Sequence, residues 1–207
     1  MRPFPTAEIP EFAVFKKLNT PAKVQDFINK LRVNFELREE TYRSPLMVLR
    51  HGEAHCAEGA MLAAAILWCH GKPPLLLDLK VAEGKGDVDH VVALFKEDGH
   101  WGAISKTNHA VLRYRDPVYK TIRELALSYF NEYFLDDGVK TLRGYSAPFN
   151  LPRGDSSWLT SPQKLQAIID RLDHSRHFDI LERDTVRRLR RADPLEIKAG
   201  QLTEWPK

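Results

Sequence analysis

The hydrophobic pattern predicts a buried helix followed at once by a strand. Residues 57–69 are apolar on nearly every side, which is typical of a helix enclosed by other layers. His70-Gly71 and then Pro73-Pro74 end this helix, because glycine favours a helix C-terminus and proline cannot continue one. From residue 75 to residue 81 apolar and polar positions alternate. This period of two predicts a strand with one buried face.

Two more strands and two amphipathic helices complete the predicted core. Residues 90–95 and 101–105 are expected to form antiparallel strands, since Glu97-Asp98-Gly99-His100 between them is a typical hairpin turn. Residues 20–31 and 121–134 carry apolar side chains at helical spacing. The predicted fold class is therefore α+β, with a buried helix packed on an antiparallel sheet.

The pattern changes after residue 136. Residues 136–162 are rich in turn residues and indicate an extended connection. A helix is expected from Ser161-Pro162 to Leu172, and a short basic helix at 185–192. We expect residues 1–145 to form a core domain, and residues 146–207 to form an extended connection and a helical appendage packed on that core.

The composition is that of an ordinary globular chain. Of 207 residues, 43% are hydrophobic and 29% are charged, which excludes disordered and fibrous classes. The longest apolar run, residues 60–69, has roughly half of the ~20 residues that a membrane-spanning helix needs. The N-terminus lacks the basic and apolar regions of a secretory signal. We therefore expect a cytoplasmic protein without a membrane partner.

The charge balance favours no polyanionic partner. The net charge is +3, from 31 basic and 28 acidic side chains, so no nucleic acid is expected to bind. The one concentrated basic run, residues 187–191, has acidic residues on both sides. It is interpreted as a solvated helix face with local ion pairs.

Cys56 is the strongest candidate for chemistry. It stands where the polar segment 51–55 turns into the buried helix, and the free N–H groups at a helix start favour the thiolate, the reactive form of cysteine. Cys69 lies inside the apolar run and is interpreted as a structural residue. At about 1.5 Å per residue, one helix holds the two thiols roughly 20 Å apart, so no disulfide is expected.

His90 is the predicted partner of Cys56, because a nucleophilic cysteine needs a histidine base close in space and not in sequence. A third polar group normally orients that base. A two-residue hairpin loop places Thr107 opposite His90, whereas a four-residue loop places Ser105 there. Ser105 has the better register. The Asn108 amide oxygen is the better acceptor for an imidazole N–H, but it reaches His90 only from a bulge or a strand end.

These segments resemble the transglutaminase-like superfamily of papain-type cysteine enzymes, in a small, bacterial-type form. The resemblance covers about residues 40–135. His55-Cys56-Ala57-Glu58-Gly59-Ala60 resembles the start of the family's nucleophile helix, Asp89-His90-Val91-Val92 its histidine strand, and residues 99–105 the strand that ends in its aspartate. Ser105 stands where that aspartate is expected. Either Asn108 substitutes for the aspartate, or the site is weakened or inactive.

The resemblance implies a papain-like fold and acyl transfer. Cys56 would attack an amide or thioester carbonyl, His90 would protonate the leaving group, and the acyl-enzyme would pass to water or to an amine. A peptide, a protein or a small amide is the implied substrate, and no cofactor is implied. The Cys56 N–H is the expected oxyanion donor, with Arg50, His51 and His55 as open candidates for the second.

Two other functions compete with this interpretation. A catalytically inactive binding module on the same fold is favoured by Ser105, which stands in place of the acid. A metal site at His51, His55 and Cys56 is not expected, because the spacing departs from His-Glu-x-x-His. The sequence does not indicate an oligomeric state.

Overall fold

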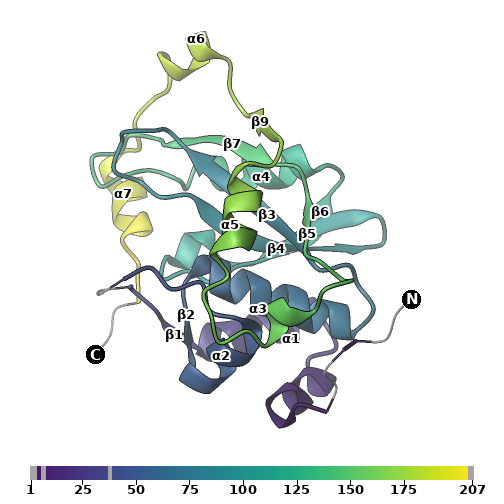
Figure 1. Cartoon of the computed structure of the whole chain (residues 1–207). Helices are drawn as coiled ribbons and strands as arrows, with labels where there is room; N and C mark the ends of the chain where they lie inside the picture. Colours follow the sequence, from purple (N-terminus) through teal and green to yellow (C-terminus); the bar gives the residue numbers. More distant parts are fainter. Residues whose placement is uncertain (1–3, 6–7, 37–38, 205–207) are drawn as a thin grey trace.

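A seven-stranded sheet runs through the computed structural model, which describes residues 4–5, 8–36 and 39–204 (Figure 1). Its order is β6-β5-β4-β3-β7-β9, with β8 also paired to β3, and neighbouring strands are antiparallel. The strands are β3 (Leu75–Val81), β4 (His90–Glu97), β5 (His100–Ile104), β6 (Arg115–Tyr119), β7 (Leu142–Ser146), β8 (Phe149–Asn150) and β9 (His177–Asp179). Two short strands, β1 (Arg32–Val33) and β2 (Glu53–Ala54), pair in parallel as a separate ribbon.

Helices cover both faces of the sheet. The described helices are α1 (Pro21–Lys30), α2 (Pro45–His51), α3 (Cys56–Cys69), α4 (Ile122–Phe130), α5 (Gln166–Asp173), α6 (Arg183–Val186) and α7 (Pro194–Gly200), with 3-10 turns η1 (Pro10–Lys17), η2 (Ala110–Leu112) and η3 (Ser157–Leu159). Helices α1, α2 and α3 pack on one face of the sheet, and α4 packs on the other. In Figure 1 the sheet lies between these two layers.

Side-chain alternation along β4 divides the core in two. Val91, Ala93 and Phe95 belong to the core under α3, whereas Val92 and Leu94 belong to the core under α4. Successive residues of a strand point to opposite faces. Because both faces are covered, β4 is a continuous apolar run in the sequence and not an alternating one.

Helix α3 is the buried helix that the sequence predicts. Every residue from Ala57 to Trp68 is buried, and Cys56 is its first residue. Helix α1 begins as expected, with Pro21 in its first turn and the Thr20 side chain accepting a hydrogen bond from the Lys23 N–H at 3.3 Å. The predicted α+β fold class, a helix that begins with cysteine packed on an antiparallel sheet, is confirmed.

Several elements were not predicted. Strands β7 and β8 lie within the segment expected to be an extended connection, and α2, β6, β9 and α7 were not anticipated. Strand β7 contains Gly144, where a Cβ would lie 3.1 Å from the Phe178 carbonyl oxygen of the neighbouring β9. Glycine weakens a strand signal in a sequence, although close strand approach requires it here.

The basic helix expected at 185–192 is only the short α6, which protrudes from the sheet in Figure 1. Arg190 instead pairs with Asp193 at 2.9 Å and with Glu196 at 2.8 Å, the two residues of the capping box that begins α7. The helix expected from Ser161-Pro162 begins later, at Gln166.

None of the helices in the described ranges has both the length and the apolar character required to cross a bilayer. The expectation about a secretory signal concerns the N-terminus, where residues 1–3 and 6–7 lie outside the described part of the chain.

Candidate active site

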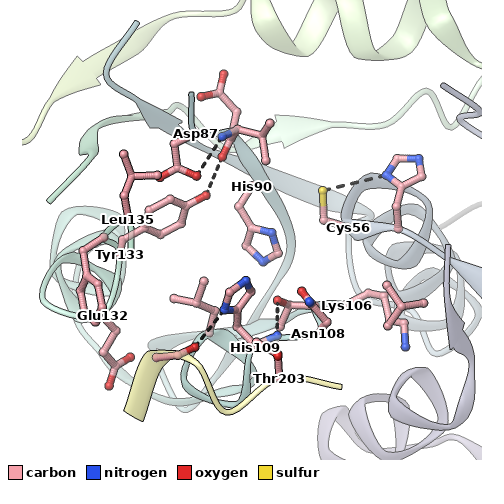
Figure 2. Close-up of a pocket in the computed structure, with 18 of the residues that line it drawn as sticks. Cys56, Asp87, His90, Lys106, Asn108, His109, Glu132, Tyr133, Leu135 and Thr203 are labelled. Atoms are coloured by element: carbon pink, nitrogen blue, oxygen red, sulfur yellow. Dashed lines mark hydrogen bonds between the residues drawn. The ribbon is translucent and has the colours of Figure 1, made fainter. Parts of the chain in front are cut away.

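A pocket of about 620 Å³ opens beside the first turn of α3 (Figure 2). Cys56, His90 and Asn108 line it, together with His55 and Lys106. Further walls come from three separate parts of the chain: residues 87–89 before β4, residues 132–136 after α4, and the C-terminal residues 197, 200, 201 and 203. The pocket therefore collects candidate residues that are far apart in the sequence.

The chain turns sharply to place Cys56 at this pocket. Gly52 ends α2 in the left-handed conformation, with φ 66°, which glycine adopts without steric cost. Strand β2 then pairs with β1, so His55 becomes the N-cap residue of α3 and Cys56 its first helical residue. The predicted position of Cys56 at a helix start is confirmed.

Burial governs the charge of the Cys56 thiol. It raises the thiol pKa to about 11, partly offset by the backbone N–H groups of Val91 and Ala57, which face the sulfur. The carboxylates of Asp78 and Glu36 raise the pKa further. Contrary to the expectation from helix position alone, Cys56 rests as a neutral thiol at pH 7, because desolvation outweighs the helix start.

His90 is also buried, with 7% of the residue exposed. Its Nε2 lies 2.7 Å from the Ser105 hydroxyl oxygen. Burial lowers the pKa of His90 to about 4, so the imidazole is neutral at pH 7. The resting site therefore holds a thiol and a neutral imidazole, and not an ion pair.

The hairpin explains why Ser105 reaches His90. Glu97 pairs with His100, so the loop has two residues. Continuing this register places Thr107 opposite His90, so the better register expected for Ser105 is wrong, and Ser105 lies diagonal to His90 on the same face. The backbone of Ser105 is held from α1, because the Gln25 amide bonds both its N–H and its carbonyl at 2.9 Å. Ser105 is the side chain that contacts the imidazole.

Asn108 lies beyond the end of β5, on the wall of the pocket. Its backbone carbonyl oxygen accepts a hydrogen bond from the Glu204 backbone N–H at 2.9 Å. The hydrogen bonds of the described residues include none between the Asn108 side chain and His90. Thr107, the other register candidate, uses its hydroxyl to accept a bond from the His109 N–H at 3.1 Å.

Cys56 and His90 line the same pocket, but the hydrogen bonds of the described residues include none between the Cys56 sulfur and the His90 ring. His90 shares its strand face with Val92 and Leu94, under α4, whereas Val91 faces α3. In Figure 2 the His90 ring points toward His109 and Asn108, and the dashed contact of the Cys56 sulfur runs in another direction. That contact, at 4.0 Å, joins the sulfur to Nδ1 of His55.

Glu58 is a buried carboxylate that the sequence analysis did not single out. It is fully buried and accepts hydrogen bonds from the Thr41 hydroxyl at 2.6 Å, the Arg43 N–H at 2.8 Å and the His55 N–H at 3.1 Å. The signal was present in the sequence, because Glu58 stands three residues after the N-cap, where a glutamate typically bonds back to the cap.

A buried aspartate also pairs with a partly buried histidine in the sheet. Oδ2 of Asp78, on β3, is 3.0 Å from Nε2 of His177, on β9. Burial raises the pKa of Asp78 to about 6, opposed by the hydrogen bond from His177. The sequence analysis treated Asp78 only as a polar position of a strand.

His51 and His55 do not share a helix, because Gly52 and β2 separate them. Over the ranges that the structure describes, no group of three or more His, Cys, Asp or Glu side chains is arranged to hold a metal ion.

The comparisons with known proteins find similarity among solved structures. No family model matches the sequence, and no curated protein matches it either. Among solved structures, the chain is similar to Legionella pneumophila LapG (EGTA-treated), with a TM-score of 0.41 and 14% sequence identity, over 78% of this chain and 86% of that one.

Proposed function

We propose that the chain carries out cysteine-dependent acyl transfer or amide hydrolysis, with Cys56 as the nucleophile. The observation that carries this proposal is the position of Cys56. It is the first residue of a buried helix, at the wall of a pocket that also holds two imidazoles, those of His90 and His55. A thiol on a rigid element beside a histidine is the arrangement that nucleophilic catalysis requires.

The reaction follows from these groups. Cys56 loses its proton to an imidazole, attacks the carbonyl carbon and forms a thioester, while the leaving group takes the proton from the imidazole. The backbone N–H groups of Ala57 and Val91 hydrogen-bond the sulfur, so they stabilise the thiolate that attacks. The Cys56 N–H at the start of α3 is the proposed oxyanion donor, and such a donor stabilises an oxyanion by about 3 kcal/mol. Water or an amine then releases the acyl group.

The proposed substrate is a peptide, a protein or a small amide. The pocket has a volume of about 620 Å³ and walls from several segments of the chain, which leaves room for a carbonyl that belongs to a larger molecule. Hydrolysis and transfer differ only in the second acceptor, water or an amine, and both use the same thioester.

A binding module without turnover is the second candidate. Two observations favour it: burial keeps the Cys56 thiol neutral, and a hydroxyl, that of Ser105, stands at His90 where a carboxylate would stabilise an imidazolium. In a binding module the pocket would hold an acyl or peptide group without forming a thioester.

Acylation by a small activated ester separates the two candidates. The wild-type chain is incubated with p-nitrophenyl acetate, and acetylation is located by peptide mass spectrometry, with Cys69 as the internal reference thiol. The enzyme proposal predicts an acetyl group on Cys56, release of p-nitrophenolate beyond one equivalent, and loss of both in Cys56→Ala. If Cys56 and Cys69 react equally slowly and no turnover appears, the chain is a binding module.

A further inference from the structure

We propose that His55, and not His90, is the base that takes the proton from the Cys56 thiol, with Glu36 and Glu58 as the carboxylates that stabilise the resulting imidazolium. This inference rests on the proposed function and names the residues that perform its first step.

One ring nitrogen of His55, Nδ1, lies near the Cys56 sulfur. Nδ1 of His55 lies 4.0 Å from Sγ of Cys56, at the long end for a hydrogen bond to sulfur, and this contact is the dashed line from Cys56 in Figure 2. Contacts of this kind are often long in a site without substrate and shorten when it binds. His55 is therefore the imidazole in direct reach of the reacting atom.

The opposite ring nitrogen faces two carboxylates. Nε2 of His55 is buried and makes no hydrogen bond within the described residues, yet it lies 3.5 Å from Oε1 of Glu36 and 3.7 Å from Oε1 of Glu58. An N–H on Nε2 is the tautomer that two acceptors favour, which leaves the Nδ1 lone pair on the side of the thiol and of the Glu58 backbone N–H. A carboxylate behind an imidazole stabilises the imidazolium form.

The surroundings fix the ring in this position. Only 11% of the His55 side chain is exposed, and the Glu58 side chain is not exposed at all. The ring of Tyr42 packs against the imidazole edge to face, with centroids 5.4 Å apart. Glu58 is itself held by Thr41 and Arg43. The cysteine, the base and one carboxylate thus belong to a single rigid segment, residues 55–58.

His90 is poorly suited to the same step. Its Nε2 partner is the uncharged hydroxyl of Ser105, which does not stabilise an imidazolium as a carboxylate does. It lies on the same strand face as Val92 and Leu94, and the hydrogen bonds of the described residues include none between its ring and the Cys56 sulfur. Burial also lowers the pKa of His90 to about 4. Position 105 thus has a serine where the resemblance leads us to expect a carboxylate, whereas the ring of His55 has two carboxylates beside it, those of Glu36 and Glu58.

The proton and the electrons balance without a co-reactant. The S–H bond breaks, its proton goes to Nδ1 of His55, and the sulfur electron pair forms the bond to the carbonyl carbon. When the bond from that carbon to the leaving nitrogen or sulfur breaks, the leaving group takes the proton from Nδ1. His55 then accepts a proton from water or an amine in the second half of the reaction, and returns it to the departing sulfur.

The test compares matched histidine variants in a Cys69→Ser background. Acylation of Cys56 is followed at pH 7 by the burst of p-nitrophenolate for His55→Gln, His90→Gln and His174→Gln. Because a positioned base contributes about 10²-fold or more, His55→Gln is expected to acylate about a hundredfold more slowly. The loss in His90→Gln is expected to be smaller, and the rate of His174→Gln, which alters an exposed side chain at the end of α5, is expected to equal the parent's.

A second readout separates a base from a structural support. Near pH 10.5, close to the thiol pKa of about 11, the thiol ionises without help, so the rates of His55→Gln and its parent are expected to converge. A variant with a distorted site stays slow at both pH values. Glu36→Gln, which removes one carboxylate and keeps its shape, is expected to show a smaller loss with the same convergence.

The outcomes distinguish the two proposals. If the parent protein acylates Cys56 and His55→Gln does so at the parent's rate, or only His90→Gln is impaired, the assignment of His55 is overturned and the proposed function stands. If the parent protein itself forms no acetyl-Cys56, the proposed function fails first.

Discussion

Burial sets the chemistry of single residues in this site more strongly than neighbouring charge does. It raises the pKa of the Cys56 thiol to about 11 and lowers that of His90 to about 4. In both cases the neutral form is favoured, because a low-dielectric environment penalises charge. A reaction at Cys56 therefore needs a base whose protonated form is stabilised by a nearby charge. His55, with Glu36 and Glu58 near its ring, meets this requirement.

Ser105 and Asn108 are expected to contribute differently to the free energy of unfolding, because Ser105 is the one whose side chain contacts His90. Ser105→Ala removes the hydroxyl that contacts the buried His90 Nε2, and an unsatisfied buried polar group costs about 1–3 kcal/mol. We expect Ser105→Ala to lower the free energy of unfolding by that amount in urea titrations. Asn108→Ala, the matched control, is expected to change it by less than about 0.5 kcal/mol. Equal effects of the two substitutions would contradict the assignment of Ser105 as the His90 partner.

At the scale of elements, the start of α3 approaches the chain beyond β5 too closely for any side chain. A Cβ added to Gly59 would lie 2.3 Å from the Cβ of Lys106. Lys106 is buried, and its Nζ donates to the Leu31 carbonyl at 2.5 Å, so both ends of its side chain are held. This contact joins the helix that carries Cys56 to the segment that carries Ser105.

Gly59→Ala is therefore expected to destabilise the fold. Overpacking of a dense region costs about 1–3 kcal/mol, and we expect a loss of this size in the free energy of unfolding, measured by urea titration. Gly154→Ala serves as the control, since nothing lies within 4 Å of a Cβ there. A Gly59→Ala variant as stable as the Gly154→Ala variant would show that α3 and Lys106 are less closely packed.

At the scale of the whole molecule, two buried titratable groups oppose each other in the dependence of stability on pH. The pKa of His90 is lowered to about 4 from an ordinary 6.5. The unfolded chain thus binds its proton first, and stability is lost as the pH falls from about 6.5 to about 4. The pKa of Asp78 is raised to about 6 from 3.8, so the folded chain binds that proton first, and stability is lost as the pH rises from about 4 to about 6.

Removing one group at a time is expected to reveal slopes of opposite sign. With Asp78→Asn, His90 remains, and the free energy of unfolding is expected to rise with pH between about 4 and 6 relative to the wild type. With His90→Asn, Asp78 remains, and the same quantity is expected to fall with pH relative to the wild type. Urea titrations at three pH values in this window measure both slopes, and two slopes of the same sign would refute the burial of one of the groups.

The sequence by itself determined the elements whose signals are local. The apolar run of α3, its end at His70-Gly71, the Thr20-Pro21 start of α1 and the existence of a hairpin turn between β4 and β5, though not its loop length, all follow from propensity and period. The position of Cys56 at a helix start followed in the same way. These signals need no knowledge of distant residues, and the structure has each of them where the pattern predicts it.

Only the tertiary structure decided which side chains meet. Strand alternation directs His90 and Ser105 to one face of β4. The turn at Gly52 and the pairing of β2 with β1 place His55 beside the sulfur, with Glu36 and Glu58 near its other ring nitrogen. Burial, which sets both pKa values, depends on the layers that close over each residue and not on its neighbours in sequence. Contacts between residues that are distant in the sequence depend on the packing of the whole chain. The local pattern therefore indicates which residues are candidates for the site, but it does not show which of them are in contact.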